Sequence, residues 1–200
     1  MERLLILIAA PLMLLNYFAG IVSFFLLIYL GNYQTAIFGL LLSAFGAFVC
    51  GLLLLPSFAA SVPGAILVAR QGFQKVVGLF LVLLGVLLTT AAILAWVGAV
   101  YYFFANQFMA GDPSLPYLLA SYSVATGPWT YMATKEDNEY SLASVFFLQL
   151  GAAIGTGAIY FADINMVDAF LLLAGVMALG LVFQLFLAKA IAAESKKWVG

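Results

Sequence analysis

The sequence predicts an all-α protein, a polytopic bundle of transmembrane helices, and two observations support this prediction. Of the 200 residues, 66% are hydrophobic and only 8% are charged, whereas about 25% of the residues of a soluble domain are charged. In addition, several uncharged apolar runs reach the roughly 20 residues that a helix needs to cross a bilayer. We therefore expect residues 1–200 to form a single integral-membrane domain.

Five of these runs are long and apolar enough to be assigned as spans directly. They cover residues of about 4–30, 36–55, 76–104, 141–161 and 167–188. The first and third exceed about 20 residues, so we expect them to tilt in the bilayer. Between the second and third spans, residues 56–75 contain two prolines and two basic residues. We expect an inner loop there, with a short helix at the membrane interface.

The number of spans depends on residues 115–134, and the basic residues favour a crossing there. With five spans, neither orientation places all seven Lys and Arg residues on one side. If residues 115–134 also cross, one side collects Arg3, Arg70, Lys75, Lys135, Lys189, Lys196 and Lys197. Cytoplasmic loops carry an excess of basic residues. We therefore favour six spans, with the N-terminus and the C-terminus both in the cytoplasm.

The polarity of residues 115–134 supports an alternative with five spans. Pro128 lacks an amide hydrogen, so it should break or kink a helix and free the carbonyl of Val124. Backbone of this kind is tolerated at membrane depth only where it packs against protein or lines a wet cavity. In the alternative, residues 115–134 form an interfacial or re-entrant segment beside five spans.

Small residues recur at regular spacing in three of the expected spans. Lipid tails are as apolar as leucine, so transmembrane helices associate where small residues let their backbones approach closely. These positions predict helix packing, either within the bundle or against another protein. They are Gly39, Ser43, Ala47 and Gly51, then Gly78, Gly85, Ala92 and Ala99, and finally Gly151 and Gly155.

Uncharged polar residues and one Gly-Pro pair form a second candidate group. Side chains of this kind either hydrogen-bond between transmembrane helices or line a polar cavity. The candidates for a cavity are Asn16, Ser121, Ser123, Thr126, Gly127, Pro128, Gln149 and Gln184.

The sequence offers little chemistry for catalysis. It contains no histidine, and its single cysteine, Cys50, lies inside an apolar run. The commonest ligand of haem and zinc is therefore missing, and a cysteine-based metal site is excluded. The known phosphate, dinucleotide and hydrolase motifs do not occur, and there is no basic tract for nucleic acid. We expect no catalytic, cofactor-binding or metal-binding residues and no enzymatic activity.

Two functions are compatible with these observations. The first is a non-catalytic, helix-packing subunit or assembly factor of a larger membrane protein complex. Its partners would be the lipid bilayer and either other membrane subunits or a second copy of this chain. The alternative is a small channel or solute-binding transporter built around a polar, proline-broken segment at residues 121–134.

Overall fold

The computed structural model describes residues 2–106, 114–136, 139–180 and 182, and in these residues the chain is all helical. The all-α prediction is therefore confirmed. The described residues form six helices: α1 (Glu2–Tyr29), α2 (Tyr33–Val68), α3 (Phe73–Asn106), α4 (Leu115–Glu136), α5 (Glu139–Phe161) and a last helix, Met166–Gly180.

Two of the described helices, α2 and α3, are long and apolar enough to cross a membrane, with 36 and 34 residues. Three shorter apolar helical stretches accompany them: Met13–Tyr29, Val145–Phe161 and Met166–Gly180. The bounds of α1, α3, α4 and α5 lie within a few residues of the spans expected from the sequence.

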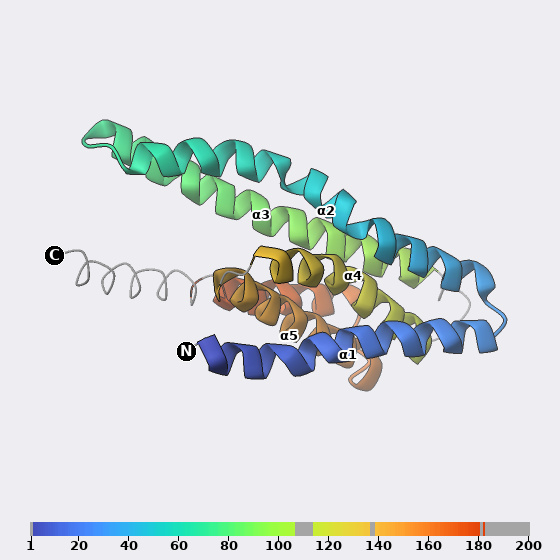
Figure 1. Cartoon of the computed structure of the whole chain (residues 1–200). Coiled ribbons are helices and arrows are strands. Elements are labelled where there is room, and N and C mark those ends of the chain that lie inside the picture. The colour runs from blue at the N-terminus through green and yellow to red at the C-terminus, as the bar shows by residue number, and fades with distance from the viewer. Residues whose placement is uncertain (1, 107–113, 137–138, 181, 183–200) are drawn as a thin grey trace.

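Consecutive helices run in opposite directions, and α4 lies in the middle of the bundle (Figure 1). It packs against α1, α2, α3 and α5. Figure 1 shows α2 and α3 as a long hairpin on one side of α4 and α1 on the other, with α5 nearby. The core therefore forms around α4, and its largest fully buried side chains include Phe104, Leu27, Leu118 and Leu148.

Short turns join the helices on both sides of α2. Gly31 and Gly72 adopt φ angles of 76° and 69°, a left-handed conformation that glycine adopts without steric cost. Asn32 caps α2, because its side chain accepts a hydrogen bond from the backbone N–H of Thr35 at 3.3 Å. Its Nδ2 also donates to the Tyr117 hydroxyl at 2.5 Å. This second bond ties the α1–α2 turn to the start of α4.

The expected loop at residues 56–75 does not form, and that prediction was wrong. Helix α2 continues through Pro56 and Pro63 to Val68, and α3 begins at Phe73. Contacts with α3 support this added helical length. The Ser57 hydroxyl donates to the carbonyl of Gly85 at 2.8 Å, and the backbones of the two helices meet at Gly64 and Gly78. The two prolines therefore lie within a packed helical hairpin.

Candidate functional site

Three serine and threonine hydroxyl groups lie inside the bundle on α4: those of Ser121, Thr126 and Thr130, each 0% exposed. Each donates to a carbonyl about one turn back in the same helix. Ser121 donates to Leu118 at 2.8 Å, and Thr130 donates to Thr126 at 2.9 Å. Such bonds use the hydroxyl hydrogen within the helix. The lone pairs of these oxygens are therefore left to accept hydrogen bonds from neighbouring helices.

Two side-chain amides use those lone pairs and join three helices. Asn16 on α1 donates from Nδ2 to the hydroxyl of Thr126 and to the carbonyl of Ser123, the latter at 3.4 Å. Gln149 on α5 donates from Nε2 to the hydroxyl of Thr130 at 2.7 Å. Asn16 is 1% exposed and Gln149 is 0% exposed. We call Asn16, Thr126, Thr130 and Gln149 the polar core; it fixes α1 and α5 against α4.

The expected break at Gly127-Pro128 does not occur, because α4 is a continuous helix from Leu115 to Glu136. Proline removes the hydrogen bond that the carbonyl four residues earlier would accept. Here that carbonyl belongs to Val124, and it accepts a hydrogen bond from Nε1 of Trp96 on α3 at 3.3 Å. A neighbouring helix thus satisfies the group that the proline frees. The prediction that Pro128 frees the carbonyl of Val124 is confirmed, whereas the prediction of a broken segment was wrong.

Gly46 on α2 accommodates the ring of Pro128. A Cβ at residue 46 would lie 2.5 Å from Cγ of Pro128 and 3.1 Å from Cζ2 of Trp96. No other residue type leaves this space, so Gly46 is a packing position that the sequence reasoning missed. The spacing of small residues gives only a partial signal, because the buried residues of α2 lie three, four or seven residues apart but this does not show what lies opposite them. They include Ala36, Gly39, Gly46, Cys50, Ser57, Ala60 and Gly64.

The predicted packing positions on α3 and α5 contact two different helices. Gly78 and Gly85 meet α2, where a Cβ would lie 2.5 Å from the backbone nitrogen of Val68 and 2.8 Å from Cβ of Ser61, respectively. Ala92 on the same helix is buried. Gly151 and Gly155 face the last helix, with a Cβ at Gly155 lying 3.2 Å from a carbonyl oxygen of that helix.

Two of the predicted packing positions are not packed. Nothing described lies within 4 Å of a Cβ at Gly51, and Ala99 is exposed. A strict spacing of four residues advances about 40° per step around a helix. The row that starts at Gly39 therefore turns away from α3 before it reaches Gly51. Its middle members, Ser43 and Ala47, instead line a groove between α1 and α2.

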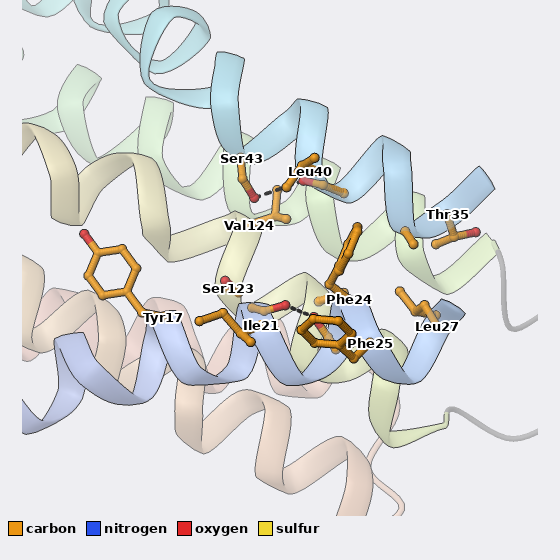
Figure 2. Close-up of a pocket in the computed structure, with 15 residues that line it drawn as sticks. Tyr17, Ile21, Phe24, Phe25, Leu27, Thr35, Leu40, Ser43, Ser123 and Val124 are labelled. Carbon is orange, nitrogen blue, oxygen red and sulfur yellow. Dashed lines mark hydrogen bonds between the residues drawn. The ribbon is translucent and has the colours of Figure 1, made fainter. Parts of the chain in front are cut away.

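This groove lies between α1 and α2, with α4 as its floor, and it has two lobes. The first lobe holds about 310 Å³ and is lined mainly by apolar residues, among them Ile21, Phe24, Leu27 and Leu40 (Figure 2). The second holds about 340 Å³ and is lined by Asn16, Tyr17, Ser43, Ala44, Ala47, Ser123, Gly127, Pro128 and Tyr131. Tyr17, Ser43 and Ser123 line both lobes, so the lobes adjoin.

The structure brings together half of the residues proposed for a polar cavity. Asn16, Ser123, Gly127 and Pro128 line the second lobe. Thr126 contacts Asn16 from within the polar core, and Gln149 bonds to Thr130 and lines neither lobe. Ser121 is buried and bonds within its own helix. Gln184 lies outside the described residues.

Some buried polar atoms have no partner among the described residues. They are the hydroxyls of Ser114 and Tyr122, Nε1 of Trp129 and Oε1 of Gln149. In the same part of the chain, no group of three or more Cys, Asp or Glu side chains is placed to hold a metal ion. Comparisons of this chain with known protein families, with curated proteins and with solved structures found no match.

Proposed function

We propose that this protein is a multi-pass integral membrane protein with six spans and with both termini in the cytoplasm. The alternating helix directions support this topology. Arg70 lies in the α2–α3 turn and Lys135 in the last turn of α4, and both segments lie at the end of the bundle where α1 begins (Figure 1). Basic residues gathered at one end of a bundle are typical of a cytoplasmic face.

The side of the membrane on which the C-terminus lies tests this topology. We expect reporters at the N-terminus and at the C-terminus both to be protected from protease in intact cells and both to be cleaved in inverted vesicles. A C-terminal reporter cleaved in intact cells, beside a protected N-terminal one, would show an odd number of spans.

We propose further that the protein is a non-catalytic subunit of a larger membrane complex. The observation that carries this proposal is the length and exposure of the α2–α3 hairpin. At 1.5 Å per residue, α2 is about 54 Å long and α4 about 33 Å, against a hydrocarbon core of about 30 Å. In Figure 1 the hairpin reaches beyond α1, α4 and α5 at its turn. We call residues 57–68 and 73–85 the distal hairpin.

The distal hairpin carries more apolar surface than a bilayer of ordinary thickness covers. The exposed side chains of the distal hairpin include Phe58, Val62, Ile66, Phe73, Val76, Leu79, Phe80 and Leu83. Large apolar patches of this kind mark interaction surfaces. A helical membrane protein that packs beside the hairpin would cover the part that lipid does not.

Site-specific crosslinking tests the docking of such a partner. A photoreactive residue at Val62 or Leu79 should crosslink to one defined membrane protein in native membranes, and that protein should co-migrate with this chain on native gels. Phe18, which is 68% exposed on α1, is the matched control and should crosslink to lipid only. A monodisperse monomer with lipid crosslinks at all three positions would contradict the proposal.

A second candidate function, binding and transport of a solute, is favoured by the groove between α1 and α2. Four of the residues proposed for a polar cavity line its second lobe. The test uses single cysteines at Ser43 and Ser123 in a Cys50→Ala background. A membrane-impermeant thiol reagent should reach Ser123→Cys from one side of the membrane. Protection of both positions in intact cells and in inverted vesicles would rule out an aqueous pathway.

A further inference from the structure

The mouth of the groove faces sideways, between α1 and α2. On α1 the side chains of Tyr17, Ile21 and Phe25 are 53%, 58% and 64% exposed, and on α2 Leu40 is 58% exposed. All four also line the first lobe. If the helices span a bilayer, these exposed side chains face lipid. A molecule dissolved in the membrane can therefore enter the groove without passing through water.

The first lobe suits an apolar chain. Two of its hydroxyl groups, those of Ser23 and Ser43, donate to carbonyls of their own helices, both at 2.9 Å. Figure 2 marks the bond of Ser43 with a dashed line. The hydrogens of both hydroxyl groups are thus already used, and the remaining walls are mainly aliphatic and aromatic. Apolar walls favour hydrocarbon over water. This lobe would hold an acyl or similar chain.

The second lobe presents a hydrogen-bond acceptor, the Oδ1 of Asn16. The hydroxyl of Thr126 donates its only hydrogen to the carbonyl of Tyr122 at 2.8 Å. The Asn16 atom that contacts this hydroxyl must therefore be the donor, Nδ2. The amide oxygen of Asn16, Oδ1, faces Gly127, and a Cβ built at Gly127 would lie 3.7 Å from it. Tyr17 lies in the same lobe and adds a hydroxyl group.

Charge and size limit the ligand further. None of the described residues that line the two lobes is charged, and a charged group at membrane depth without a partner is strongly disfavoured. An anionic head would also place its own acceptors against the Oδ1 of Asn16. Each lobe lies at the lower end of the range of about 300–1,000 Å³ for ligand pockets.

We infer that the groove binds one uncharged, membrane-dissolved amphiphile, with its chain in the first lobe and a hydroxyl-bearing head beside Asn16 in the second. Monoacylglycerols have this chemistry. The inference rests on the second candidate function, because it specifies the ligand of that function. It requires only that the groove binds this ligand. If the protein binds the ligand but does not transport it, the transport function is contradicted and the inference is not.

Photolabelling of the purified full-length protein tests the inference. The probe is a monoacylglycerol with a diazirine in its acyl chain, and the matched probe is the free fatty acid with the same chain. We expect the monoacylglycerol to label peptides that line the first lobe and an excess of unlabelled monoacylglycerol to suppress that labelling about tenfold. The fatty acid should label these peptides several-fold less.

Substitutions that fill the groove provide a second test of the inference. Ala47→Phe and Ser43→Phe should each lower the specific labelling about tenfold, whereas Ala91→Phe, at an exposed position of α3 that lines neither lobe, should leave it unchanged. Size-exclusion profiles and thermal unfolding curves identify variants that fail to fold.

Two results would overturn the inference. One is labelling of groove peptides that an excess of unlabelled monoacylglycerol does not reduce, because that pattern indicates annular lipid only. The other is equal labelling by the two probes, because it would show that the head is not recognised. Competition in the unmodified protein needs no substitution, so the inference remains testable even if both phenylalanine variants misfold.

Discussion

Helix α4 and the α2–α3 hairpin both reverse the relation between polarity and burial that a protein in water shows, each in the opposite sense. Helix α4 is the most polar of the helices, and most of its described residues are buried. The hairpin is almost entirely apolar, and only a minority of its residues are buried. In water the apolar hairpin would be buried and the polar helix exposed. The reverse arrangement is stable where the surroundings are themselves apolar and polar groups find partners only inside the protein.

The two regions are also held together differently. Backbones meet in the hairpin, where Gly64 and Gly78 lie at the contact. In contrast, α4 is joined to its neighbours by side-chain hydrogen bonds from Asn16, Gln149 and Trp96. The hairpin should therefore be sensitive to added volume and α4 to lost hydrogen bonds. Three predictions test this contrast, in order of decreasing effect.

The largest effect should follow from Gly78→Leu. A Cβ there would lie 2.5 Å from the backbone nitrogen of Val68 and 2.8 Å from the carbonyl oxygen of Gly64, and neither atom can move without displacing α2. We expect the free energy of unfolding to fall by about 3 kcal/mol, measured by titration with a denaturing detergent in mixed micelles. Gly51→Leu is the control, because nothing described lies within 4 Å of a Cβ there. Equal losses at the two glycines would contradict close backbone packing.

A smaller effect should follow from Trp96→Phe, which removes the hydrogen bond to the carbonyl of Val124. The expected loss is about 1 kcal/mol in the free energy of unfolding. In a Pro128→Ala background the loss should shrink, because the new amide at residue 128 can donate to that carbonyl. A double-mutant cycle measures this coupling, which we expect to be about 0.5–1 kcal/mol. Additive effects would show that Trp96 does not compensate for the proline.

The smallest effect should follow from Gln149→Leu. It removes the hydrogen bond to Thr130, and buried bonds between membrane helices contribute about 0.6 kcal/mol on average. The hydroxyl of Thr130 still donates to the carbonyl of Thr126, and the unpartnered Oε1 of Gln149 is removed as well. We therefore expect a loss below about 1 kcal/mol in the same titration. A loss as large as that of Gly78→Leu would mean that the polar core dominates stability.

Much of the fold could be predicted from composition and run length, and the exception at residues 56–75 has a physical explanation. Two prolines there favour a loop when the segment is considered alone. The structure shows a helix because small residues, among them Ser57 and Gly64, let α3 approach and support it. The same reasoning missed Gly46, whose role depends on Pro128 lying opposite it on another helix. Neither contact can be inferred from sequence spacing.

The sequence predicted which residue types form the candidate site more successfully than it predicted how those residues are arranged. Asn16, Ser123 and Gly127 do line one lobe, whereas Ser121 bonds within its own helix. On α4, residues 121 and 123 lie about 200° apart around the axis, so they face different neighbours. Which of them faces the groove depends on the rotation of α4 about its axis, which its four neighbouring helices set.

By itself the sequence determined that the chain is helical, apolar on most of its surface and poor in catalytic groups. These properties follow from composition and from the length of apolar runs, which are local. Only the tertiary structure decided that α4 is continuous and that a groove with a polar and an apolar lobe lies beside it. The physical reason is that the carbonyl of Val124 and the amide of Asn16 find their partners on other helices. Whether a polar segment breaks or stays helical depends on those partners.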